Sequence, residues 1–75
     1  MQLQLYYFDG CIYCQKVIRF IEQKNIPITY KNIHKEPDAY QELMRIGGKN
    51  QVPCLFIDGK PLYESNEIIN WLRTN

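Results

Sequence analysis

The sequence predicts one α/β domain with a mixed sheet, and three observations support this prediction. The chain has 75 residues, which suffices for one hydrophobic core and one domain. Strand-like and helix-like apolar patterns follow one another in the order strand, helix, strand, helix, hairpin, helix. A strand–helix–strand crossover implies a parallel pair, and a hairpin adds an antiparallel pair. We therefore expect a four-stranded mixed sheet with three helices on its faces.

The first half of the chain is expected to form a strand, a helix and a second strand. Apolar and polar residues alternate over residues 3–7, and Asp9-Gly10 then breaks the strand. A helix should follow and end near Lys24-Asn25, with a buried face made of Cys14, Val17, Ile18 and Ile21. After Ile26-Pro27, alternation over residues 28–33 predicts the second strand.

The second half is expected to contain a helix, a hairpin and a last helix. Glu36-Pro37-Asp38 is a typical helix start, and Gly47-Gly48 should cap the other end. The buried side of this helix is predicted to consist of Tyr40, Leu43, Met44 and Ile46. Residues 54–57 and 61–63 form a hairpin around Asp58-Gly59. Residues 64–66 offer N-caps for a last helix that buries Ile68, Ile69, Trp71 and Leu72.

Composition and charge exclude several classes of function. Nine Lys and Arg residues oppose eight Asp and Glu residues, and these charges are dispersed along the chain. This pattern argues against a nucleic-acid or membrane partner. No apolar run approaches the length of a membrane span, and the first residues do not resemble a signal peptide. We therefore expect a cytoplasmic protein.

The three cysteines are the strongest chemical signal in the chain. Cys11 and Cys14 are separated by two residues, at the expected junction of a strand and a helix. In a reducing compartment, such a pair is more often redox-active or metal-binding than structural. The partial positive charge at a helix N-terminus favours a thiolate. Cys11, at the exposed end, is therefore the predicted nucleophile, and Cys14, one turn into the helix, is the predicted resolving thiol.

The same cysteine pair is also compatible with a metal-binding or a purely structural role. Cys54 and the single histidine, His34, could complete a four-ligand zinc site with Cys11 and Cys14. No second closely spaced pair supports such a site, however. The pair could also be an inert structural feature.

Several motifs resemble those of glutaredoxins, and this similarity covers nearly the whole chain. It is carried by residues 6–17 around Cys11-Ile12-Tyr13-Cys14, by Gln51-Val52-Pro53, and by residues 62–65. The resemblance implies a thioredoxin fold over residues 1–75, with glutathione as co-substrate and no permanently bound cofactor. It also implies that Pro53 follows a cis peptide bond and that the backbone of Val52 pairs with the cysteinyl backbone of glutathione.

Further glutathione contacts are implied by position. Glu64-Ser65 resembles a Glu-Ser pair of glutathione-transferase N-terminal domains, in which the serine and the helix N-terminus hold the γ-glutamyl carboxylate. Plain N-capping by Ser65 would use the same residue. Tyr13 could cover the bound sulfur, Lys49 could pair with the glycine carboxylate, and Gln51 is a weaker candidate. Cys54 is expected to be a packing residue.

The chain departs from the glutaredoxin pattern at two places. Ile12 stands where many members have proline, and this restores a backbone N–H near the nucleophile. Phe8 stands where many have lysine, with Asp9 beside it, and the anion works against a thiolate at Cys11.

The predicted function is glutathione-dependent reduction of disulfides and of protein–glutathione mixed disulfides through Cys11, by a monomer. One alternative is a redoxin that is reduced by a thioredoxin-type flavin reductase. A second is an iron–sulfur binding module in which two chains share a cluster through Cys11 and glutathione. A third is a transferase-like domain that lacks its helical partner domain, against which the intact cysteine pair argues.

Overall fold

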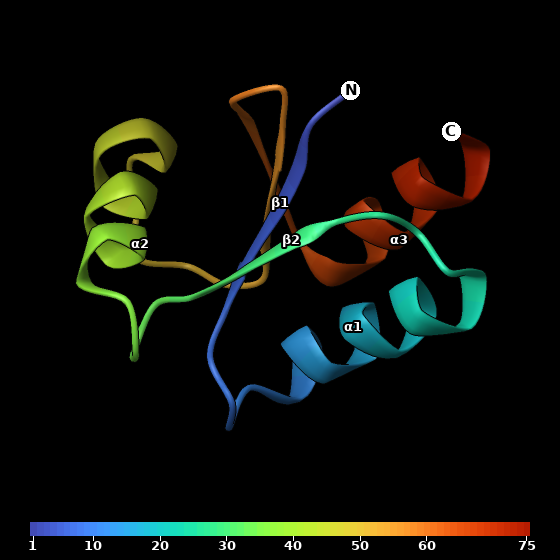
Figure 1. The fold of residues 1–75 in the computed structure, drawn as a ribbon, viewed down its shortest axis with the longest axis horizontal. Coiled ribbons are helices and arrows are strands. Elements are labelled where there is room, and N and C mark those ends of the chain that lie inside the picture. Colours follow the sequence, from blue (N-terminus) through green and yellow to red (C-terminus); the bar gives the residue numbers. More distant parts are fainter.

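The computed structural model describes all residues 1–75, and its elements follow the order expected from the sequence (Figure 1). The first half holds β1 (Leu3–Tyr7), α1 (Ile12–Lys24) and β2 (Thr29–Asn32). The helix α2 (Pro37–Glu42) continues into a π-helical turn, η1 (Leu43–Gly47). The chain ends with β3 (Cys54–Ile57), β4 (Lys60–Tyr63) and α3 (Ser65–Thr74).

The strands form one mixed sheet in the order β2-β1-β3-β4. β1 is parallel to β2, with Tyr7 opposite Asn32, and antiparallel to β3, with Tyr6 opposite Cys54. β3 and β4 are antiparallel and are joined by a two-residue turn. Asp58 and Gly59 in this turn have φ values of 49° and 85°, which suit the twist of a tight hairpin. The predicted four-stranded mixed sheet with three helices is therefore confirmed.

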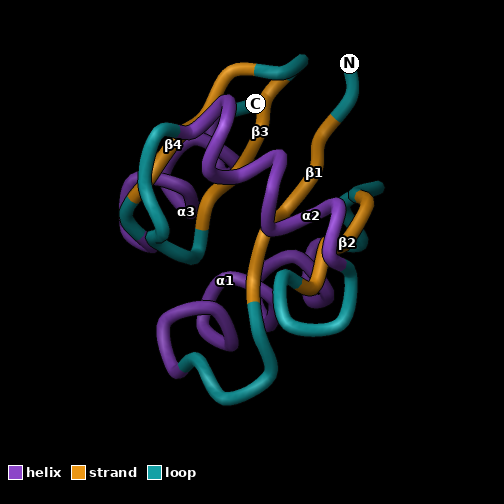
Figure 2. The backbone as a smooth tube through the Cα atoms, turned by 90° about the vertical axis from the view of Figure 1, so that its left-hand side faces the viewer, coloured by secondary structure: helices purple, strands orange, loops and turns teal.

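The helices divide between the two faces of the sheet. Figure 1 shows α1 and α3 on one side and α2 on the other, and Figure 2 shows α2 crossing in front of the strands. Because side chains alternate along a strand, neighbouring residues contribute to different cores. Leu5 and Leu55 pack under α1 and α3, whereas Tyr6, Cys54 and Phe56 pack under α2. This arrangement places the start of α1, with both motif cysteines, at one end of β1.

The first core is built largely as the sequence indicates. Its buried residues from the two helices are Val17, Ile21, Ile68, Ile69 and Leu72. Burying each aliphatic side chain of this kind stabilises the fold by roughly 1.5–3 kcal/mol. Trp71 and Ile18 are only partly buried and pack against the edge of the same core. No helix in the chain has both the length and the apolar character needed to cross a bilayer.

The predicted buried side of the second helix is wrong in most of its members. Leu43 is buried, but Tyr40, Met44 and Ile46 are exposed by 41%, 37% and 42%. Ala39 and Leu43, four residues apart, face the sheet instead. The π-helical turn after Glu42 shifts the phase of later residues, so the helical spacing assumed for Met44 and Ile46 does not hold.

The end of this helical segment uses its two glycines for different purposes. Gly48 has a φ of 83° and caps the segment in the left-handed conformation, as expected. Gly47 lies against the side chain of Tyr63, and a methyl group at its Cα would overlap the Tyr63 hydroxyl. Gly48 is therefore required for its left-handed backbone conformation, whereas Gly47 is required because Tyr63 packs closely against it.

Candidate functional site

Cys11 occupies the N-cap position of α1. Its backbone is extended, with φ −85° and ψ 113°, and its Sγ accepts a hydrogen bond of 3.2 Å from the backbone N–H of Cys14. The first turn of α1 contains no acidic residue. The Cys11 sulfur thus receives a direct N–H donor and lies at the positive end of the helix dipole. Cys11 is half-buried, so a substrate sulfur can reach it.

Cys14 has the opposite environment. Its side chain is fully buried in the first turn of α1. Burial, reinforced by the hydrogen bond with Cys11, raises the pKa of the Cys14 thiol to about 12. At neutral pH Cys14 is therefore a protonated thiol that faces away from solvent. The two cysteines thus differ in environment, since Cys11 is partly exposed and Cys14 is buried.

Cys54 belongs to another part of the molecule. It is fully buried in the core under α2, on the face of the sheet away from α1. Burial raises the pKa of its thiol to about 11. All three cysteines are free, and no three metal-ligating side chains converge on one point. Cys11, Cys14, Cys54 and His34 therefore do not gather into a zinc site.

The loop between β1 and α1, which carries Cys11, is held by the loop after β2. The ring of Phe8 stacks on that of His34, with centroids 4.5 Å apart and planes inclined by 13°. Asp9 accepts a hydrogen bond from Asn32 Nδ2 at 3.3 Å and pairs with Lys35 Nζ at 3.3 Å. These two contacts partly balance the negative charge of Asp9, which lies two residues before Cys11 in the sequence.

Asn32 is the centre of this arrangement, because it is one of two buried polar residues in the chain. Its Oδ1 accepts the backbone N–H groups of His34 and Lys35 at 2.9 and 3.2 Å. Its own N–H donates to Glu36 Oε2 at 3.2 Å. The side chain therefore organises the second loop and connects it to the loop that carries Cys11. Nothing in the local sequence pattern singles Asn32 out for this role.

Replacing Asn32 should therefore destabilise the domain. Asn32→Ala leaves the turn N–H groups and Asp9 without their partner, and we expect the free energy of unfolding to fall by roughly 1–3 kcal/mol. Asp9→Asn is the matched control, because it removes only an exposed ion pair, worth at most about 1 kcal/mol. Urea unfolding of both variants measures the difference. Equal losses would show that Asn32 does not organise the loop.

A groove beside the start of α3 gathers most of the predicted glutathione contacts. Its volume is about 410 Å³, and its lining comprises Tyr13, Gln51, Val52, Pro53, Glu64, Ser65 and Asn66. Six of these seven residues are the ones predicted from the sequence. The Val52–Pro53 peptide bond is cis, as the resemblance to glutaredoxins implied. The backbone of Val52 makes no hydrogen bond within the chain and is available to a ligand.

The N-terminus of α3 forms part of the lining of this groove. Glu64 precedes the helix with a φ of 73°, which is unusual for a residue with a side chain, and its Oε2 accepts a 2.9 Å hydrogen bond from Gln51 Nε2. Ser65 is the first residue of the helix, not its cap, and its buried side chain has no capping hydrogen bond. The N–H groups of the first turn have no backbone partner. A plain capping role for Ser65 is therefore wrong.

Three residues depart from the expected site. Lys49 does not line the groove, because its Nζ lies 4.4 Å from the centre of the Tyr63 ring. Cys11 does not line it either, although Tyr13, two residues later, does. Asn66 lines the groove but was not predicted as a ligand-binding residue. Its position directly after Ser65, in the first turn of α3, was the signal that could have identified it.

Comparison with known proteins identifies the family. A family model of the glutathione S-transferase N-terminal domain matches residues 5–75. The chain belongs to this family. No curated protein matches the sequence. Membership of the family connects this domain with glutathione chemistry in general and confirms a glutaredoxin-like protein of thioredoxin fold.

Solved structures share the fold, and a transferase among them also agrees with the family assignment. Glutathione transferase Omega 3C from Trametes versicolor is 31% identical, with a TM-score of 0.84, and the match covers 99% of this chain and 33% of the transferase. The domain therefore spans about a third of that enzyme. A thioredoxin-like protein of similar size has a TM-score of 0.84 at 20% identity, with 97% of each chain covered. The holo form of glutaredoxin C1 from Populus tremula x tremuloides matches at 21% identity with a TM-score of 0.74, covering 97% of this chain and 75% of that one.

Proposed function

We propose that this domain is a glutathione-dependent thiol–disulfide oxidoreductase with Cys11 as its nucleophile. The observation that carries the proposal is the contrast between the two motif cysteines. Cys11 Sγ accepts the N–H of Cys14 at the helix N-terminus, whereas Cys14 is buried and protonated. Thiol–disulfide exchange needs one accessible thiolate. A second thiol is needed only to resolve the mixed disulfide that forms with a protein disulfide substrate.

The proposed reaction is a two-step exchange. The Cys11 thiolate attacks the glutathione sulfur of a protein–glutathione mixed disulfide. The original S–S bond breaks, the substrate protein leaves as a thiolate that takes up a proton, and Cys11 becomes glutathionylated. A second glutathione thiolate then attacks that glutathione sulfur, which releases the Cys11 thiolate and oxidised glutathione. The net change releases the substrate as a thiol and consumes one reduced glutathione, whose sulfur joins the glutathione unit of the mixed disulfide in one molecule of oxidised glutathione.

The groove beside α3 has the features that would orient glutathione in this reaction. The unpaired N–H groups of α3 and the Ser65 hydroxyl suit a carboxylate, and the Glu64 carboxylate suits an ammonium group. The γ-glutamyl end of glutathione carries both groups on one carbon. The free backbone of Val52 would pair with the cysteinyl unit, and Tyr13 and Gln51 would flank it. Lys49 would reach the glycine carboxylate only after leaving the ring of Tyr63.

We further propose that residues 1–75 act as one domain, as a monomer in the reducing cytoplasm, where glutathione is abundant. The substrates would be glutathionylated or disulfide-containing proteins. The family match and the motif cysteines support this proposal, and the transferase-like alternative would not need a buried second thiol.

The decisive experiment is an assay of turnover on a small glutathione mixed disulfide. With glutathione as reductant we expect turnover that saturates in glutathione concentration. A thioredoxin-type flavin reductase, offered in place of glutathione, should support none. Turnover with the flavin reductase alone would replace this proposal by the redoxin alternative. Absence of turnover with either reductant would refute an oxidoreductase role.

A further inference from the structure

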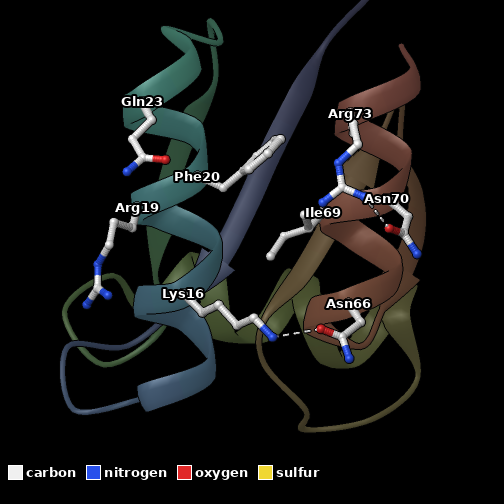
Figure 3. Close-up of a pocket in the computed structure, with 8 residues that line it drawn as sticks. All are labelled: Lys16, Arg19, Phe20, Gln23, Asn66, Ile69, Asn70 and Arg73. Carbon is white, nitrogen blue, oxygen red and sulfur yellow. Dashed lines mark hydrogen bonds between the residues drawn. The ribbon is translucent and has the colours of Figure 1, made fainter.

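A second groove runs between α1 and α3, on the face of the sheet away from α2 (Figure 3). Its volume is about 520 Å³. Figure 3 shows the apolar side chains of Phe20 and Ile69 between the two helices, with Lys16 near one end and Arg73 near the other. We call this feature the basic groove and define it by Lys16, Arg19, Phe20, Ile69 and Arg73.

Every charged residue that lines the basic groove is a cation, and the two at its ends are not neutralised. Lys16 Nζ donates to Asn66 Oδ1 at 2.8 Å, and Arg73 donates to Asn70 Oδ1 at 3.0 Å. These amide partners are neutral, and neither cation takes part in the ion pairs of the chain. Arg73 also lies over the ring of Phe20, at 5.9 Å. The two cations are thus held in place while they keep their charge.

No carboxylate of either helix enters the groove, although both helices carry one. Glu22 of α1 and Glu67 of α3 are absent from its lining. The chain as a whole has a net charge of only +1. The positive potential here therefore comes from the local placement of charges, not from a basic protein. Such a groove attracts anionic groups and repels cationic ones.

The basic groove begins where the candidate glutathione groove ends, because Asn66 lines both. From Lys16 to Gln23, α1 advances by about 10 Å, which an extended peptide covers in about three residues. The start of α1 at Cys11 lies about 7 Å before Lys16 along the helix, or about two residues of extended peptide.

We propose that the basic groove docks an acidic segment of the disulfide substrate. The segment would lie about two to five residues from the substrate cysteine that reacts with Cys11. Its carboxylates would meet Lys16 and Arg73, and its aliphatic carbons would cover Phe20 and Ile69. This inference rests on the proposed function and adds a substrate class to it: proteins with acidic residues beside a glutathionylated cysteine.

The test uses pairs of short glutathionylated peptides with one cysteine each. One peptide of each pair carries Asp and Glu at two to five residues from the cysteine, and its partner carries Asn and Gln. At low ionic strength we expect kcat/KM for the acidic peptide to be about tenfold higher, and this ratio should fall as salt is added. Equal values for the two peptides would overturn the inference.

Two charge-reversal variants locate the effect. Lys16→Glu with Arg73→Glu should abolish or invert the preference. Lys24→Glu with Lys60→Glu is the matched control, because it changes the net charge equally at exposed positions outside the groove. The control should keep the preference, and a small mixed disulfide without flanking residues should be turned over equally by all forms. A preference that survives in the first variant would contradict the proposal.

Two further measurements distinguish failure of this docking proposal from failure of the proposed function on which it rests. If no substrate is turned over, the proposed function fails. Binding to the basic groove can still be measured by fluorescence anisotropy with labelled peptides that carry Ser instead of Cys. Tighter binding of the acidic peptide is then expected, and equal binding would overturn the inference. Analytical ultracentrifugation tests whether a second copy of the chain occupies the basic groove. A dimer that the Lys16→Glu, Arg73→Glu variant dissociates would show that a second copy fills the groove, which also overturns it.

Discussion

Cys11→Ser should abolish turnover of glutathionylated substrates, to below about a thousandth of the wild-type rate, because a serine hydroxyl is not ionised at neutral pH. Cys14→Ser should keep turnover of a small glutathione mixed disulfide within about threefold of wild type, because free glutathione resolves the intermediate. The same variant should lose activity on protein disulfides that need an internal resolving thiol. Steady-state kinetics on one substrate of each kind measures all of these rates.

The structure explains why the Cys11→Ser and Cys14→Ser substitutions should have different effects. Cys11 is half-buried and accepts an N–H at the helix start, whereas Cys14 is fully buried with its pKa raised to about 12. At pH 7 the Cys14 thiol is therefore protonated and shielded. Alkylation at neutral pH should accordingly modify Cys11 first.

Two controls belong with this experiment. Cys14→Ala removes the thiol without burying a hydroxyl, so it separates loss of chemistry from loss of stability. Cys54→Ser should change turnover little, because Cys54 lies under α2 on the other face of the sheet. If Cys14→Ser and Cys14→Ala are as inactive as Cys11→Ser, a dithiol cycle replaces the proposed route. If Cys54→Ser alone is inactive while folded, Cys11 is not the nucleophile.

Ser65→Ala should raise the KM for glutathione by about tenfold or more, because a hydrogen bond to a charged group contributes roughly 1.5–3 kcal/mol. The free energy of unfolding should stay within about 0.5 kcal/mol, because the hydroxyl makes no capping bond and alanine favours helices. Kinetics with varied glutathione and urea unfolding measure the two quantities. An unchanged KM would remove Ser65 from the proposed glutathione site.

A thiol without a γ-glutamyl group provides the control for this prediction. Mercaptoethanol can resolve glutathionylated Cys11 but has no carboxylate to place at the N-terminus of α3. Its rate should therefore be the same with Ser65→Ala as with the wild-type chain. A loss of similar size with both thiols would indicate that the substitution disturbs Cys11 itself.

The elements of the fold and much of the candidate site could be predicted from the sequence, because their signals are local. A period of two or 3.6 residues identifies strands and helices within one window. Asp58-Gly59 needs only its own φ values to make the hairpin turn, and Cys11 needs only its place before α1 to become an N-cap. The glutathione contacts predicted around Pro53 and Ser65 do lie on one groove.

Contacts between segments, by contrast, depend on how the elements pack, and periodicity does not contain that information. The second helical segment carries apolar residues on more than one side, and only packing against the sheet buried Ala39 and Leu43 and left Tyr40 exposed. Lys49 has a long flexible side chain, so its position in the sequence does not predict that it contacts Tyr63 and does not line the groove.

The sequence by itself determined the order of the elements, the position of Cys11 before α1 and most of the residues that border the candidate glutathione groove, since each depends on neighbours along the chain. Only the tertiary structure decided that Asn32 supports the loop of Cys11 and that Cys54 lies on the face away from Cys14. It also decided that Lys16 and Arg73 flank one groove with no acid between them. The physical reason is that these relations join residues from different elements, and they arise only when the helices pack on the sheet at a particular position.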